Sequence, residues 1–233
     1  SKQPVFVKTP MSTPGESLFL RRGQLSLSAE GTLEGDVALH FTGHAAGDGR
    51  TNLIGESAEK RMESVKKLVT AVHPSAEVTN IAVENVDDTT QALTYKYHLR
   101  IPGYAQRTGK RLLFAPLFFQ QGATPRFSAS QRKYPIAFRY AWREDDELRI
   151  QLPEGFEMDN GDNPGNLGFD PAGGYQLVIS VSKGKELLVG RTLEFGRRGN
   201  IMFAEKAYPT LKQIFDEVHR RDGTILSLKQ VTP

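Results

Sequence analysis

The sequence predicts a mainly β protein with two helices, of the α+β class. Apolar and polar residues alternate in several segments, and two other segments show the 3.6-residue spacing of helices. The strands come in runs and do not alternate with helices, which argues against a parallel βαβ sheet. We therefore expect an extended lead-in over 1–17 and two β-sandwich-like units, 18–130 and 131–233, each with antiparallel sheets and one packed helix.

The first unit begins with a predicted antiparallel hairpin over residues 24–41, because its apolar residues alternate on both sides of a glycine-containing turn. A helix follows at about 57–72. Ser57 is its expected N-cap and Pro74 ends it. Strands are expected at about 76–85 and 91–101. The stripe of apolar residues on the helix comprises Ala58, Met62, Val65, Leu68, Val69 and Val72.

The second unit is expected to hold the strands "YQLVISVS" and "ELLVGRTLEF", joined by a tight turn at 183–185. A helix at about 209–220 starts near Pro209, since proline suits the first helical position. A last strand, "TILSLKQV", follows the turn at Asp222 and Gly223. The apolar stripe of this helix comprises Leu211, Ile214, Phe215 and Val218.

The segment 133–156 mixes aromatic, basic and acidic residues. Its alternation predicts a half-buried hairpin whose charged turn, 143–146, faces solvent. Ile136, Phe138, Tyr140 and Trp142 would then share one buried face. The functional alternative is that Tyr140 or Trp142 lies exposed as a stacking platform for a sugar or a peptide.

The segment "KRLLFAPLFF" is more apolar than an exposed loop should be, and Pro116 interrupts it. We expect a short edge strand followed by a crossing segment that fills the seam between the two units. The functional alternative is a docking surface for another domain or protein, formed by Phe114, Leu117, Phe118 and Phe119.

Composition argues against several classes of function. A net charge of +3 without clustered Lys and Arg gives no nucleic-acid surface, and no apolar run is long enough to span a membrane. The chain has no cysteine and hence no thiol nucleophile, disulfide or thiolate metal site. His40 and His44 lack the helix and the glutamate that a zinc motif requires. The loop 159–170 is expected to be an ordinary turn, because it lacks the spacing of an EF-hand; the functional alternative is that this loop binds calcium. We predict no catalytic residue, metal or cofactor.

Several motifs resemble a family of bacterial proteins with an N-terminal domain of unknown function, a transglutaminase-like papain-fold core and a C-terminal β-rich region. The stretch "RKYPIAFRYAWREDDELRIQLPEGF" is similar to the family pattern R-x-Y-P-[IV]-x-F-x-Y … I-x-L-P-E-G-[YF]. "GTLEGDVALHFTGHAAGDGR" resembles the stretch after the core, and the final helix and strand resemble the family's ending. The likeness spans residues 18–230 and concerns the C-terminal β-rich region.

The resemblance implies a non-catalytic accessory module of a larger protein, which packs on or positions an upstream catalytic core. The family's Cys-His-Asp triad would lie upstream of Ser1, so the partners expected are the missing N-terminal and core domains and possibly another protein. The missing initiator Met fits that expectation. Export to the periplasm or secretion is implied by the resemblance alone. A stand-alone carbohydrate- or peptide-binding β-sandwich is the alternative, and an enzyme is the least favoured.

Overall fold

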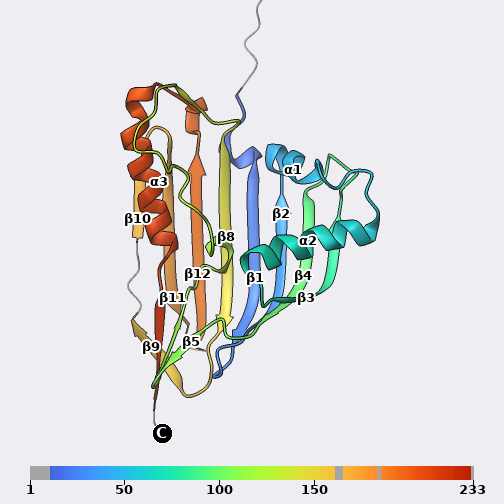
Figure 1. Cartoon of the computed structure of the whole chain (residues 1–233), viewed down its shortest axis with the longest axis vertical. Coiled ribbons are helices and arrows are strands. Elements are labelled where there is room, and N and C mark those ends of the chain that lie inside the picture. The colour runs from blue at the N-terminus through green and yellow to red at the C-terminus, as the bar shows by residue number, and fades with distance from the viewer. Residues whose placement is uncertain (1–10, 161–164, 183–184, 232–233) are drawn as a thin grey trace, which may run out of the picture.

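A computed structural model describes residues 11–160, 165–182 and 185–231. Its centre is an eight-stranded mixed sheet in the order β10-β11-β12-β8-β1-β2-β4-β3, with α2 and α3 lying over one face (Figure 1). The fold is thus mainly β, in the α+β class. The strands of this sheet are β1 Leu18–Leu27, β2 Leu33–Phe41, β3 Glu77–Glu84, β4 Leu93–Ile101, β8 Trp142–Gln151, β10 Gly165–Phe169, β11 Gly173–Val181 and β12 Glu186–Phe195.

Two smaller sheets complete the β structure. A four-stranded sheet in the order β5-β6-β14-β9 contains β5 Gln106–Thr108, β6 Arg111–Phe114, β14 Leu226–Gln230 and β9 Phe156–Asn160. The short strands β7 Ile136–Ala137 and β13 Met202–Phe203 pair with each other. The prediction that β6 is an edge strand is wrong, because β6 lies between β5 and β14. Pro116 lies after the end of β6 and therefore does not interrupt the strand.

The prediction of two separate β-sandwich-like units with antiparallel sheets is wrong. β1 pairs in parallel with β8, from Leu18 opposite Arg143 to Ser26 opposite Gln151, so strands from both predicted units form one continuous sheet. β2, β4 and β3 extend the sheet on one side, and β12, β11 and β10 extend it on the other. Alternation within a segment does not reveal which distant segment pairs with it, so the sequence pattern could not show the β1–β8 contact.

The two predicted helices are confirmed as α2, Ala58–Val72, and α3, Tyr208–Asp222. The hydroxyl of Ser57 accepts a hydrogen bond from the Lys60 amide and caps α2 as expected. The structure adds a third α-helix, α1, over Gly43–Arg50. The predicted hairpins β1–β2 and β11–β12 are also present. Short 3-10 helices occur at η1 Pro14–Glu16, η2 Phe118–Gln120, η3 Arg197–Gly199 and η4 Glu205–Ala207.

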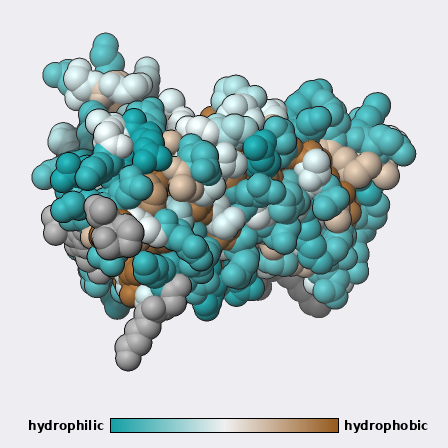
Figure 2. All heavy atoms as spheres, turned by 90° about the horizontal axis from the view of Figure 1, so that it is seen from below, coloured by the Kyte–Doolittle hydropathy of each residue, from teal (hydrophilic) through white to brown (hydrophobic). Residues whose placement is uncertain are grey.

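Some predicted features lie outside the described residues: most of the lead-in (1–10), part of the loop after Asp159 (161–164) and most of the turn at 183–185. The described ends of the chain, near Met11 and Val231, lie at opposite ends of the molecule (Figure 1). Seen from below, the surface is mostly hydrophilic, with small separate hydrophobic areas (Figure 2). No helix in the described ranges is long and apolar enough to cross a bilayer.

Candidate functional site

The predicted charged turn at 143–146 is instead the first half of β8, and this places charged side chains inside the protein. Successive side chains of a strand point to opposite faces, so Trp142, Glu144 and Asp146 share the face covered by the helices. The residues that follow on this face, Leu148 and Ile150, are buried in the core. Acidic side chains thus lie in the middle of the sheet, where they need partners.

Those partners come from the strands on either side. Asp146 lies opposite Arg21 of β1 and opposite Arg191 of β12, so three adjacent strands present charges at one level. Arg191 is 2% exposed, and Asp222 at the end of α3 accepts from its Nε at 2.7 Å and from its second Nη at 2.8 Å. We call this set the charge cluster; its members are Arg21, Glu144, Asp146, Arg191 and Asp222.

Glu144 is held by three donors. One oxygen accepts from Nη atoms of Arg191 at 2.8 Å and Arg21 at 3.1 Å, and the other accepts from the Trp142 indole Nε1 at 3.1 Å. Burial alone would raise the pKa of Glu144, but Arg191 and Arg21 outweigh burial and lower the pKa to about 2. Glu144 is therefore ionised at neutral pH and firmly placed.

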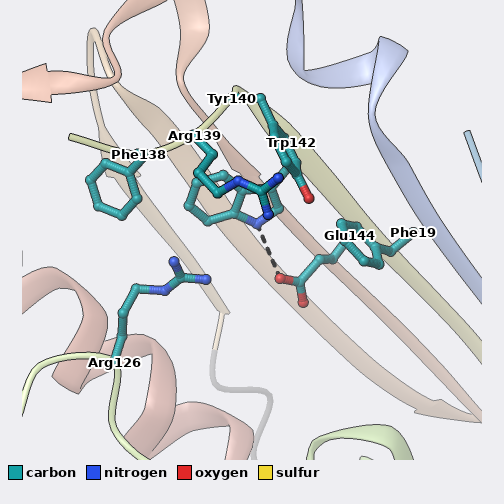
Figure 3. Close-up of a pocket in the computed structure, with 7 residues that line it drawn as sticks. All are labelled: Phe19, Arg126, Phe138, Arg139, Tyr140, Trp142 and Glu144. Carbon is teal, nitrogen blue, oxygen red and sulfur yellow. Dashed lines mark hydrogen bonds between the residues drawn. The ribbon is translucent and has the colours of Figure 1, made fainter. Parts of the chain in front are cut away.

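A hollow of about 190 Å³ opens beside this carboxylate. We call it the Trp142 pocket; its lining residues are Phe19, Arg126, Phe138, Arg139, Tyr140, Trp142 and Glu144. Arg126 and Glu144 extend toward the same space beside the Trp142 ring (Figure 3). Aromatic rings, guanidinium groups and one carboxylate thus meet at the end of the sheet where β1 and β8 begin.

Arg126 comes from the segment between η2 and β7 and lies among aromatic rings. Its guanidinium carbon is 4.7 Å from the centre of the Trp142 ring, 5.2 Å from that of Phe215 and 5.7 Å from that of Phe138. These are cation–π distances. Its outer side remains exposed, yet burial of the guanidinium lowers its pKa and Glu144 only partly opposes this.

The rim of the pocket is fixed by α1. The Tyr140 hydroxyl donates to Asp48 at 2.8 Å, and the Tyr140 ring stacks on His44 with 4.8 Å between ring centres. Arg139 pairs with the same Asp48 at 3.0 Å. α1 is itself held to the start of β1, because the His44 amide donates to the Ser17 hydroxyl at 3.2 Å. The rim is therefore held in place without a ligand.

The residues predicted as an exposed stacking platform lie at this pocket but are not a platform. Trp142 is 5% exposed and packs against Phe195 with 4.8 Å between ring centres. Tyr140 is half-buried, and one face of its ring is covered by His44. The main expectation, that Trp142 lies on a buried face, is therefore confirmed, and the alternative of an exposed platform is wrong for Trp142.

The predicted docking surface is mostly core. Phe114, Leu117 and Phe118 are 2%, 1% and 3% exposed, so they cannot contact a partner. Phe119 is half-buried and lines a second hollow of about 210 Å³ between η2, α2 and the sheet. The functional alternative for this segment is therefore wrong for three of its four residues, because the segment packs inside the chain.

The sequence missed the arginines and the carboxylates. Arg21, Arg126 and Arg191 are far apart in sequence, and none belongs to a recognisable motif. The one local signal is that Trp142, Glu144 and Asp146 continue the alternation of Leu148 and Ile150, which indicates a strand running through the acidic run. Within the described part of the chain, no three His, Asp or Glu side chains gather to hold a metal ion.

Comparison with known proteins supplies a family. The model described as "Domain of Unknown Function with solved-structure structure (DUF3858)" matches residues 110–228, just over half of the 233-residue chain. The chain belongs to the DUF3858 family. The matched region of this DUF3858 protein includes β8, β12 and α3, which carry Trp142, Glu144, Asp146, Arg191 and Asp222.

Other comparisons add little. No curated protein matches the chain. One solved structure, from Parabacteroides distasonis ATCC 8503 and described as a "putative protease", aligns with 53% of this chain and 24% of its own at 16% identity and a TM-score of 0.41. The aligned part thus spans about a quarter of that protein, and the likeness carries no conclusion about function.

Proposed function

We propose that this DUF3858 protein is a non-catalytic accessory module of a larger transglutaminase-like protein, which packs on or positions the catalytic core. One observation carries the proposal: the groups at the Trp142 pocket are suited to binding and not to reaction. Glu144 is the carboxylate among its lining residues, and three donors hold it ionised with a pKa of about 2. A general acid or base at neutral pH needs a pKa near 7, so Glu144 is poorly placed to transfer protons.

The resemblance of the sequence to the region after a papain-fold core supports the same role. The pocket lies at the end of the sheet next to Ser17, since the Arg143 amide donates to the Ser17 carbonyl at 3.1 Å. The described part of the chain therefore enters the sheet at the same end as Tyr140 and Arg139. The resemblance also supports export to the periplasm or secretion.

The carbohydrate-binding alternative is less well supported. Sugars bind to broad exposed aromatic faces, whereas Trp142 is buried and Tyr140 is covered on one side by His44. A peptide side chain, by contrast, fits a hollow of about 190 Å³.

The proposal is tested on the full reading frame, expressed with and without residues 11–233. We expect an upstream core with Cys, His and Asp, and transamidase or peptidase activity that disappears when that Cys is replaced. In the full-length protein, hydrogen exchange in α1 and residues 138–143 should be slower than in the separate chain. Turnover by this chain alone, or a reading frame without such a core, would contradict the proposal.

A further inference from the structure

The guanidinium of Arg126 lies at the Trp142 pocket without an ion pair to any described residue. The other charged groups of the pocket are engaged elsewhere: Arg139 pairs with Asp48, and Glu144 accepts from Arg21 and Arg191. The ring centres of Trp142 and Phe215 lie 4.7 Å and 5.2 Å from its guanidinium carbon, but these rings offer no oxygen or nitrogen acceptor to its N–H donors.

The guanidinium of Arg126 is partly withdrawn from water, although its outer side remains exposed. Glu144 attracts the charge of Arg126 but is farther than an ion-pair distance, and burial still lowers the pKa of Arg126. The charge cluster holds three carboxylates and two arginines and therefore has one negative charge in excess. Arg126 balances this excess only at long range. An anion in direct contact with Arg126 would compensate for the lost hydration.

The size and lining of the pocket limit what that anion can be. A hollow of about 190 Å³ is smaller than the ~300–1,000 Å³ typical of sites for drug-sized ligands. Its walls are the rings of Phe19, Phe138, Tyr140 and Trp142, which suit an apolar group next to the anion. A planar guanidinium binds a carboxylate through two parallel charge-assisted hydrogen bonds, which are stronger than those that the neutral hydroxyl groups of a sugar accept.

We propose that the Trp142 pocket binds the carboxylate of a peptide, with Arg126 as the anchor and the adjoining apolar group against the aromatic walls. The carboxylate can come from a chain terminus or from an acidic side chain. This goes beyond the accessory role, because it assigns a ligand class to the pocket whether or not a catalytic core lies upstream.

Trp142 provides a direct reading of binding, because it is the single tryptophan of the chain and its indole N–H donates to Glu144 inside the pocket. The ¹⁵N-labelled chain gives one indole signal, which is followed during titration with four probes. N-acetyl-phenylalanine carries a terminal carboxylate and N-acetyl-glutamic acid amide a side-chain carboxylate. N-acetyl-phenylalanine amide and N-acetyl-glutamine amide are the uncharged counterparts.

We expect a saturable shift of the indole signal with at least one acid and none with its uncharged counterpart; which acid binds more tightly identifies the source. Arg126→Gln should weaken that binding about tenfold or more, as expected for loss of a charge-assisted hydrogen bond. Arg126→Lys, which keeps the charge but not the planar pair of donors, should weaken it less. Arg132→Gln is the matched control, because Arg132 is exposed in the same segment and should bind as the unchanged chain does.

The acid and amide probes need no variant, so the comparison holds even if Arg126→Gln disturbs folding. Equal shifts with acid and amide, no shift with either acid at millimolar concentration, or unchanged affinity in a folded Arg126→Gln variant would each overturn the proposal. None of these results bears on whether the full reading frame encodes a catalytic core, so the two proposals fail separately.

Discussion

Buried charges at the centre of a sheet are tolerated here because each finds partners of opposite sign. The side chain of Asp146 has no exposed surface, and it accepts hydrogen bonds from Arg21 and from Gln120 of η2 at 2.9 Å. Arg191 joins β12 to α3 through Asp222, and the Tyr175 hydroxyl donates to the same Asp222 at 2.8 Å. Such a cluster adds little net stability over an apolar core, but removing one member leaves a charge unpaired.

Glu144→Gln tests whether removing one member of the charge cluster destabilises the fold. The substitution leaves Arg21 and Arg191 with one carboxylate fewer in a buried place, so the free energy of unfolding should fall by about 3 kcal/mol. The measurement is denaturant unfolding at pH 7. Glu147→Gln is the control, since Glu147 pairs with Arg22 on the exposed face and both side chains are more than half exposed. Such a surface pair contributes at most about 1 kcal/mol. Equal effects of the two variants would contradict the role of the cluster.

The low pKa of Glu144 predicts that the free energy of unfolding depends on pH. The pKa of Glu144 is about 2 in the folded chain and near its ordinary value of 4.5 in the unfolded chain. The unfolded state therefore binds the proton first as pH falls. The stabilising contribution is complete above about pH 5 and is lost between about 4.5 and 2. Unfolding free energies from pH 7 to pH 2.5 should fall less steeply for Glu144→Gln than for the unchanged chain, and parallel curves would contradict the assignment.

At the scale of elements, α2 carries two apolar faces of different kinds. Val65 and Val69 are buried against the sheet, whereas Leu68 and Val72 are 55% and 43% exposed beside the half-buried Phe119. The packing of η2 against the end of α2 is provided by Phe118, whose ring stacks on His73 with 4.8 Å between centres. Adjacent apolar residues in this region therefore differ sharply in how much they stabilise the fold.

Phe118→Asp and Leu68→Gln compare a buried apolar residue of this region with an exposed one. Phe118 is 3% exposed, so a buried carboxylate at this position should cost at least about 4 kcal/mol and lower the melting temperature sharply. Leu68→Gln should change the free energy of unfolding by no more than about 0.5 kcal/mol, because its side chain is mostly in solvent. Thermal melts followed by circular dichroism compare the two variants. An unchanged melting temperature for Phe118→Asp would show that the ring is not core.

Local pattern predicted the elements whose signal is local. The stripe of α3 and the alternation of β11 and β12 appear within a dozen residues, and both are confirmed. The sequence pattern did not predict α1, because "GHAAGDGR" has three glycines and no apolar stripe. It is held instead by Arg50, which donates to the backbone carbonyls of Asn85, Val86, Asp88 and Gln91. The acidic start of β8 has the pattern of a surface turn when its partners are not known. Those partners, Arg21 and Arg191, lie 125 and 45 residues from Asp146 in the sequence.

At the scale of the whole molecule, the parallel contact between β1 and β8 decides how many folding units the chain has. β8 lies between β1 and β12 and forms hydrogen bonds with both along nearly its whole length. Separating the chain near residue 130 would expose one edge of β1 and one of β8, and would also break the charge cluster. An exposed edge of that length is prone to aggregation.

We therefore expect fragments 11–130 and 131–233 not to fold independently. Each alone should melt without a cooperative transition, because residues 131–233 lose Arg21 beside a buried Asp146 and residues 11–130 lose the strand that covers β1. Mixed and refolded together, they should form a 1:1 complex that restores the single indole signal of Trp142.

Circular dichroism melts and NMR spectra of the fragments, singly and together, make the comparison. Arg21→Met in the first fragment is the informative variant, since it removes the partner of Asp146 while leaving the β1 backbone intact, and it should weaken the complex. Arg22→Met is its control, because Arg22 points to the exposed face and pairs with Glu147. A cooperative melt of residues 131–233 alone would mean that the second half holds together without β1, and that the charges beside Asp146 are not what joins the two halves.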